Sequence, residues 1–499
     1  MKRVLLSAVL VTLMGSVMAQ DVYDVARIAS NDLSGTARFI GMGGAMGALG
    51  GDITTASTNP AGLGIFRSRD VSISGGTLML ANKDMDKKNR ASVDQFGILF
   101  SSKYSDYSPL RYLNFGFNFR KRANFFDSYG VTNDWDGVFS QTYSMADMTY
   151  NEIDYTKMPT LAAMAAKSGV LVQDELGYKG VGANYTYFNT VQTGGVNEFD
   201  VSVGANINNR VFLGASIGYY DVRYARSSYY TEDGTDGAYY NLWNEYLTDG
   251  SGVDFKFGAI FRPIEESGFR LGVAVHTPIF YRLTDSNSAY IEAFDSDDHK
   301  IGYQSADVEP VDYRLNSPWK FNFSLGQTIG NYLALGAEYE LATPQSMILR
   351  NANGSQSAYT DYVDDTVREF LKATHTVRLG IELKPVEEIS IRAGYNFVTS
   401  LYEKGAYRSL MDFTDMGVDT FTDTQYENLF SQQRITGGIG CRIDRFYMDL
   451  AYQYAMQKSD FYAFDDYYTD ATTGQKVFLP ATELQKKRHQ LTLTLGFKF

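Results

Sequence analysis

Few residues of this chain have the types and spacing that catalysis or metal binding requires. No HExxH motif or comparable histidine pair occurs. The four histidines lie far apart, at His276, His299, His375 and His489. Cys441 is the single cysteine, which excludes an intrachain disulfide and a cysteine-based metal cluster. We therefore expect no metal and no cofactor.

One nucleophile motif is present, the GxSxG match from Gly214 to Gly218 with Ser216 at its centre. A catalytic serine in this motif needs a sharp turn from a strand into a helix. Here the serine falls in the middle of a predicted strand, residues 210–223, and no helix is predicted after it. We interpret the motif as small side chains on one face of a strand, and we expect that the protein is not an enzyme.

A glycine-rich stretch and a predicted turn precede the first predicted strand. GMGGAMGALGG at 41–51 lacks the GxGxxG spacing of a dinucleotide site, and no strand precedes it. Asn59, Pro60, Ala61 and Gly62 then suit a type I turn, because Asn favours its first position, Pro its second and Gly its fourth. The turn fits either an ordinary surface turn or part of a compact plug inside a barrel.

The first nineteen residues predict a secretory signal peptide. Lys2 and Arg3 precede a mostly apolar run from Val4 to Val17, and Val17-Met18-Ala19 resembles a small-x-small cleavage site. We expect cleavage after Ala19, and no lipobox cysteine follows it. No later apolar run reaches the roughly 20 residues of a transmembrane helix.

Apolar residues alternate with polar residues through most of the chain. Gln490 to Phe499 alternates over ten residues, which is the length of a tilted membrane-spanning strand. The same period recurs in Leu113 to Arg120, Val253 to Arg262 and Ile389 to Phe397. A soluble sandwich would turn the apolar face inward, whereas a membrane barrel turns it toward lipid. The signal peptide, the terminal Phe499 and the aromatic content of 14% favour the barrel.

The fold class that we predict is an all-β transmembrane antiparallel barrel of about fourteen strands. The strands are expected near 69–79, 91–102, 110–120, 196–208, 210–223, 252–263, 269–280, 318–328, 331–342, 373–384, 388–398, 433–443, 445–455 and 489–499. Long polar connections alternate with short ones, as in outer-membrane barrels with long extracellular loops and short periplasmic turns. The even count puts both ends of the barrel on the periplasmic side.

The long connections are expected at 121–195, 224–251, 281–317, 343–372, 399–432 and 456–488. Residues around 180–208 fit either a longer strand or a loop extension. Met158 to Val172 is the one amphipathic helical stretch, and it fits either a helix packed on the barrel or an apolar surface for a ligand. The formal net charge of −13 argues against nucleic acid as a partner.

Several short motifs resemble the FadL-type outer-membrane transporters of long-chain fatty acids and aromatic hydrocarbons. The N-terminal motifs are Ala37-Arg38, Met42-Gly43-Gly44-Ala45, Asp52 and Asn59-Pro60-Ala61-Gly62-Leu63, and a Pro-Trp strand start lies within Asn316 to Phe321. The resemblance implies a signal peptide at 1–19, an N-terminal hatch at 20–68 and a barrel at 69–499. It also implies that Asn59 to Gly62 form the hatch turn and that Phe499 ends an outer-membrane sorting signal.

The resemblance further implies passive uptake of hydrophobic small molecules such as fatty acids, with outer-membrane lipid and the barrel-assembly machinery as partners during export and biogenesis. Two alternatives stay open. One is a haem-binding receptor, for which His276 on the predicted lumenal face is the candidate ligand. The other is a barrel that shuttles or anchors secreted proteins.

Overall fold

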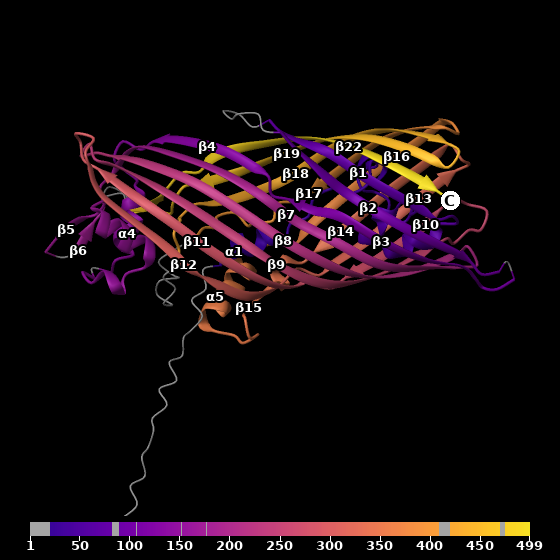
Figure 1. Cartoon of the computed structure of the whole chain (residues 1–499), viewed down its shortest axis with the longest axis horizontal. Coiled ribbons are helices and arrows are strands. Elements are labelled where there is room, and N and C mark those ends of the chain that lie inside the picture. The colour runs from indigo at the N-terminus through magenta and orange to yellow at the C-terminus, as the bar shows by residue number, and fades with distance from the viewer. Residues whose placement is uncertain are drawn as a thin grey trace, which may run out of the picture.

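The computed structural model describes residues 20–81, 89–105, 107–150, 152–175, 177–408, 420–469 and 475–499. Its main feature is a closed antiparallel β-barrel (Figure 1). Eighteen strand segments form the wall, and four pairs of them are halves of one interrupted strand, which gives fourteen wall strands. The first strand pairs with the last, Asp70 opposite Lys498, and closes the barrel. The predicted fold class is confirmed.

The uninterrupted wall strands are β1 (Asp70–Leu80), β2 (Asn89–Lys103), β7 (Ala183–Ile207), β8 (Val211–Gly234), β9 (Tyr239–Phe261), β16 (Thr374–Val386), β17 (Ile389–Val398), β18 (Tyr426–Ile443), β19 (Phe446–Tyr462) and β22 (Thr482–Lys498). The interrupted ones are β3 (Leu110–Asn124) with β4 (Asp127–Asp134), β10 (Arg270–His276) with β11 (Phe280–Phe294), β12 (Lys300–Asn316) with β13 (Lys320–Ile329), and β14 (Leu333–Ala342) with β15 (Ile348–Asn351). Each predicted strand corresponds to one of these fourteen.

Three of the interruptions lie side by side, and each contains a proline: Pro278, Pro318 and Pro344. A proline has no N–H to give to the strand ladder, so these residues end one half of each strand. The wall stays connected at this level, because the Ser317 N–H donates to the Ile279 carbonyl at 3.0 Å. The Thr343 N–H likewise donates to the Trp319 carbonyl at 3.2 Å.

The outward face of each long strand changes from apolar to polar part of the way along. On β8, Ile217 and Tyr219 are exposed apolar residues, whereas Asp221 and Arg223 follow on the same face. The inward face changes in the opposite sense, from the buried Ser216 to apolar side chains further along β8. The apolar outer belt faces lipid, and the polar outer surface beyond it faces water. The change therefore marks the outer boundary of the membrane.

The predicted long loops are consequently corrected. Much of 224–251 and 281–317 is strand, because β8, β9, β11 and β12 extend far beyond the membrane belt (Figure 1). Their outward residues there are polar, so the sequence has the composition of a loop. The open question at 180–208 is also resolved, since β7 begins at Ala183.

Helices cover the end of the barrel that extends beyond the membrane belt. A lid (residues 138–182) contains α3 (Gln141–Asp147), η3 (Tyr155–Lys157), α4 (Thr160–Ser168), β5 (Val172–Asp174) and β6 (Gly177–Lys179). Further elements are η4 (Pro344–Ser346), α5 (Ala358–Phe370), β20 (Tyr467–Thr469) and β21 (Lys476–Phe478). The predicted helix is confirmed as α4, which packs on β11 and β12 with Leu161 and Met164 buried. Among the described residues, no helix is long and apolar enough to cross a membrane.

The N-terminal segment (residues 20–66) lies inside the barrel. It contains α1 (Val22–Ile28), α2 (Ala37–Gly41), η1 (Ile53–Ser57) and η2 (Pro60–Ile65). Its α1 helix joins the lid, α5 and inward wall residues in one large apolar cluster. The inward face of the wall is thus mostly polar at the level of the membrane, where the N-terminal segment forms small apolar clusters of its own. Beyond that level the inward face contributes to the large apolar cluster.

Inward-facing glycines of the wall receive the main chain of the N-terminal segment. A Cβ added to Gly258 would overlap Asn59 Oδ1, and a Cβ added to Gly214 would overlap the main chain of Pro60. Further round the wall, on β14, a Cβ on Gly336 would overlap the Ala45 carbonyl. These strand glycines therefore permit a close approach that any larger residue would block.

We predict that Gly258→Ala displaces the turn at Asn59 and lowers the free energy of unfolding by about 1–3 kcal/mol, the usual cost of overpacking. The measurement is thermal unfolding of the detergent-purified protein. Gly437→Ala is the matched control, because the nearest atom to a Cβ there is 3.9 Å away. Equal stability of the two variants would contradict the close packing.

Candidate functional site: a cavity between the N-terminal segment and the wall

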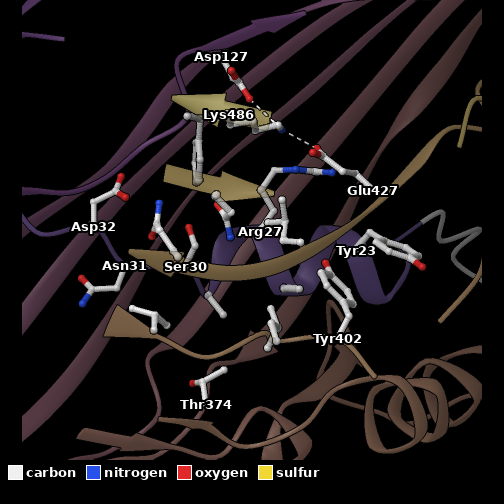
Figure 2. Close-up of a pocket in the computed structure, with 18 of the residues that line it drawn as sticks. Tyr23, Arg27, Ser30, Asn31, Asp32, Asp127, Thr374, Tyr402, Glu427 and Lys486 are labelled. Carbon is white, nitrogen blue, oxygen red and sulfur yellow. Dashed lines mark hydrogen bonds and ion pairs between the residues drawn. The ribbon is translucent and has the colours of Figure 1, made fainter. Parts of the chain in front are cut away.

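A cavity of about 320 Å³ lies between the N-terminal segment and the barrel wall (Figure 2). Part of its lining is apolar, with Phe125, Phe188, Leu429 and Phe461 from the wall and Phe39 from the N-terminal segment. Figure 2 shows α1 crossing the cavity, with Tyr23 and Arg27 on it and Tyr402 beside Tyr23. The two tyrosine rings stack at 5.2 Å between centroids.

Charged side chains dominate the polar part of the lining, and basic ones outnumber acidic ones by nine to six. The basic residues are Arg27, Arg120, Arg226, Lys320, Arg378, Arg408, Arg434, Lys486 and Arg488; the acidic residues are Asp21, Asp24, Asp32, Asp127, Glu340 and Glu427. The chain as a whole carries a formal charge of −13, so this excess of positive charge is local. A cavity of this kind favours an anionic group.

Most of these charges are fixed by ion pairs. Lys486 donates to Asp127 at 2.9 Å and to Glu427 at 2.7 Å, and both contacts appear as dashed lines in Figure 2. Arg378 pairs with Glu340 at 2.9 Å. These pairs connect strands distant in sequence, and they position the cavity wall before any ligand arrives.

Two cations at the inner side of the cavity have no carboxylate within 4 Å among the described residues. Lys320, at the start of β13, is half-buried. Arg122 is buried with its Nε unpaired, while its Nη2 donates to the Ala29 carbonyl at 3.3 Å. Both line a smaller adjoining cavity of about 20 Å³, which has room for about one water molecule. Of the two, Lys320 also lines the larger cavity, so it is the side chain that an anion bound there would meet.

Charged contacts hold the N-terminal segment against opposite sides of the wall. Arg38 makes two hydrogen bonds to Glu382 on β16, at 2.9 and 3.1 Å, and a third to the Gly51 carbonyl at 2.9 Å. The Gly47 N–H donates to Glu338 on β14 at 2.9 Å. Asn114 on β3 donates to the Leu63 carbonyl at 2.7 Å. The segment is anchored from several directions at once.

The predicted turn residues begin the η2 helix. Asn59 Oδ1 accepts from the Ala61 N–H at 3.1 Å, and the Gly62 N–H donates to the Asn59 carbonyl at 2.9 Å, as in a type I turn. Pro60, Ala61 and Gly62 are all buried. The turn therefore lies inside the barrel rather than on its surface, and its role as a moving hatch stays a prediction.

His276 lies on the lumenal face, 8% exposed, with its Nε2 at 2.8 Å from the Thr58 carbonyl. This nitrogen is engaged by the N-terminal segment, which fits a structural histidine better than a haem ligand. The described residues contain no group of three or more His, Cys, Asp or Glu side chains placed to hold a metal ion. Ser216 lies within β8, buried, and receives a hydrogen bond from Ser202 at 2.7 Å. Phe499 follows β22 and exchanges two main-chain hydrogen bonds with Arg69, each at 3.1 Å.

The seam between the lid and the wall contains two acids outside the membrane, the half-buried Asp466 and the buried Glu232. The Asp466 carboxylate accepts from the Ser140 N–H at 3.1 Å, and burial raises the pKa of Asp466 to about 7. Repulsion from Asp147 and Asp465 also raises this pKa. Glu232 accepts from the Gln141 N–H at 2.9 Å, and burial raises the pKa of Glu232 as well.

The chain has no match among curated protein sequences. A family model described as BamG matches residues 138–371, just under half of the chain. Among solved structures, a Pseudomonas aeruginosa FadL homologue is similar, with 12% identity, a TM-score of 0.53 and coverage of 94% of this chain and 99% of that one. The deltaS2S3 mutant of the TodX monoaromatic hydrocarbon channel has 11% identity, a TM-score of 0.50 and coverage of 93% and 99%.

The apolar belt, the fourteen closed strands and the long extensions define an outer-membrane β-barrel. The two structural comparisons confirm the predicted resemblance as one of fold: the chain has the FadL-type fold over nearly its whole length. The predicted outer-membrane localisation is confirmed by the same features. Cleavage after Ala19 stays a prediction.

We predict that Arg38→Met loosens the N-terminal segment, because the segment loses its hydrogen bonds to Glu382. The wall itself should stay intact, because Glu382 still pairs with Arg392 at 2.6 Å. Ion conductance through planar lipid bilayers should show openings that the unmodified protein lacks. Arg368→Met, which removes an exposed pair with Asp365 on α5, is the control. Conductance traces identical to those of the control would contradict a latch at Arg38.

We predict that the lid is held most firmly at acid pH. Asp466 is protonated in the closed lid below about pH 7, whereas the exposed carboxyl of an open lid loses its proton near the ordinary value of 3.8. The closed lid therefore becomes less stable relative to the open lid as the pH rises from about 4 to about 7. Limited proteolysis of the lid should be faster at pH 8 than at pH 5.5.

Asp466→Asn should reduce this pH dependence, and Asp297→Asn, at an exposed loop tip, should leave it unchanged. Glu232 titrates in both variants, so part of the dependence should remain. A lid that is cut equally fast at both pH values would contradict the proposed role of the seam.

Proposed function

We propose that this barrel binds hydrophobic small molecules with an anionic head and admits them passively across the outer membrane. The observation that supports this most directly is the cavity, which combines aromatic walls with Lys320, a cation that has no carboxylate within 4 Å among the described residues. Long-chain fatty acids fit that chemistry, because an apolar tail gains by leaving water while the carboxylate meets Lys320.

In this proposal the N-terminal segment is the gate. The cavity is bounded by Asn31, Asp32, Leu33 and Thr58 of that segment, so movement of the segment would open the cavity toward the periplasmic side. The latch at Arg38 and the turn at Asn59 are then the contacts that such a movement breaks. Small side chains along the segment permit sliding against the wall glycines.

The test is fluorescence titration of the purified protein with a long-chain polyene carboxylate and with the matching neutral alcohol. The carboxylate should bind more tightly than the alcohol. Lys320→Met should lower the ratio of the two affinities about tenfold, because the loss of one charged contact costs about 1.4 kcal/mol. Lys404→Met, at an exposed loop position, is the control. Equal affinity for acid and alcohol would overturn the anionic head, and no saturable binding of either would overturn the transport function.

A second function is favoured by the BamG match, a name that points to barrel assembly. The matched residues 138–371 contain the lid, α5 and the extensions of β7, β8, β9, β11 and β12 outside the membrane, together with the membrane-level parts of the strands from β7 to β14. In that role the chain would act on other outer-membrane proteins rather than on a small ligand. Depletion of the protein from cells distinguishes the two functions. If the chain assists barrel assembly, the amounts of other outer-membrane barrel proteins should fall. If it is a transporter, only the uptake of hydrophobic molecules should fall.

A further inference from the structure

Asp285 is a buried carboxylate with no ionic partner among the residues that the structure describes. It lies on β11, 4% exposed, beyond the membrane belt. Its oxygens accept from the hydroxyls of Tyr246 at 2.6 Å and Tyr313 at 3.2 Å, both neutral donors. Among the described residues, no Lys or Arg nitrogen lies within 4 Å of it. A buried carboxylate in this position is costly unless a cation balances it.

The neighbouring acids of α1 are balanced. Asp21 pairs with Arg408 at 2.7 Å, and Asp24 pairs with Arg27 at 2.6 Å. Asp285 is thus the one of these three carboxylates that is left with neutral donors alone. A cation that balances Asp285 would have to reach this end of the N-terminal segment, where Asp21 and Asp24 also lie.

Gln20 is the residue that reaches Asp285. It is fully buried, and its side-chain amide donates to Asp285 Oδ2 at 2.8 Å, while its Oε1 has no partner. The hydroxyl of Tyr359 on α5 donates to its carbonyl. The sequence independently predicts signal-peptide cleavage between Ala19 and Gln20. Cleavage at that bond gives Gln20 an α-ammonium group at this buried position.

We propose that the α-ammonium group of the mature N-terminus is the counter-ion of Asp285. Cleavage of the signal peptide would then supply the charge that completes the seating of α1 inside the barrel. The inference rests on cleavage after Ala19 and is independent of the proposed transport function. It assigns to Asp285 and Tyr359 a binding site for the chain's own N-terminus.

The proposal has a chemical consequence for Gln20. An N-terminal glutamine cyclises when its neutral amine attacks the side-chain amide carbon, which forms a lactam and releases ammonia. An ammonium ion paired with a carboxylate has no free electron pair for that attack. The folded protein should therefore keep an open Gln20 with an amine that resists acylation.

The test is mass spectrometry of the N-terminal peptide after treatment of the folded, detergent-purified protein with an amine-acylating reagent. The folded protein should begin at an uncyclised Gln20. Its amine should be acylated about tenfold more slowly than in the unfolded protein, because pairing that raises the pKa of the amine by about one unit lowers the fraction of reactive neutral amine about tenfold. Asp285→Asn keeps the hydrogen-bonding shape and should restore acylation or cyclisation in the folded state. Asp307→Asn, at an exposed position of β12, is the control.

Heat-dependent electrophoretic migration confirms that each variant is a folded barrel. A mature chain that starts elsewhere, a cyclised Gln20 in the unmodified protein, or equal acylation of its folded and unfolded forms would each overturn the proposal. So would a folded Asp285→Asn that behaves like the unmodified protein, because burial alone would then explain the protection. If Asp285→Asn does not fold, the pH dependence of acylation in the folded parent chain decides the outcome: an amine paired with a carboxylate should titrate above the ordinary range of about 7.7–8.0, and one that titrates within or below that range would overturn the proposal.

Discussion

Every main-chain polar group that crosses a membrane must find its hydrogen bond within the protein, and the rest of this structure depends on that constraint. Fourteen strands meet it by closing on themselves through the pairing of β1 with β22. A barrel of this size encloses more space than wall side chains fill. The N-terminal segment occupies that space, and the glycines of the wall let its main chain approach closely.

The interior changes character at the membrane boundary, and the cavity lies where the two parts meet. Toward the periplasmic side, partly buried ion pairs such as Arg38 with Glu382 hold the N-terminal segment. Toward the outside, α1, the lid and α5 form an apolar core with the extended strands. The cavity combines both chemistries, which is why we connect it with molecules that have an apolar tail and an anionic head.

Strand positions were predictable because two-residue alternation survives wherever one face meets lipid, as in Gln490 to Phe499. The extensions of β8 and β11 were missed, since outside the membrane their outward residues turn polar and have the composition of loops. The residues alone left the turn at Asn59 either on the surface or in a plug inside the barrel, and the resemblance favoured the plug. The cavity could not be assigned, because partners such as Lys486 and Asp127 lie hundreds of residues apart.

The most direct measurement is native mass spectrometry of the protein extracted from its own membrane, with organic extraction of what co-purifies. We expect a bound apolar molecule with an acidic head, which is lost or exchanged when Arg38→Met loosens the N-terminal segment. An empty protein, or one that carries only other outer-membrane proteins in stable complex, would contradict the uptake of hydrophobic molecules through this barrel.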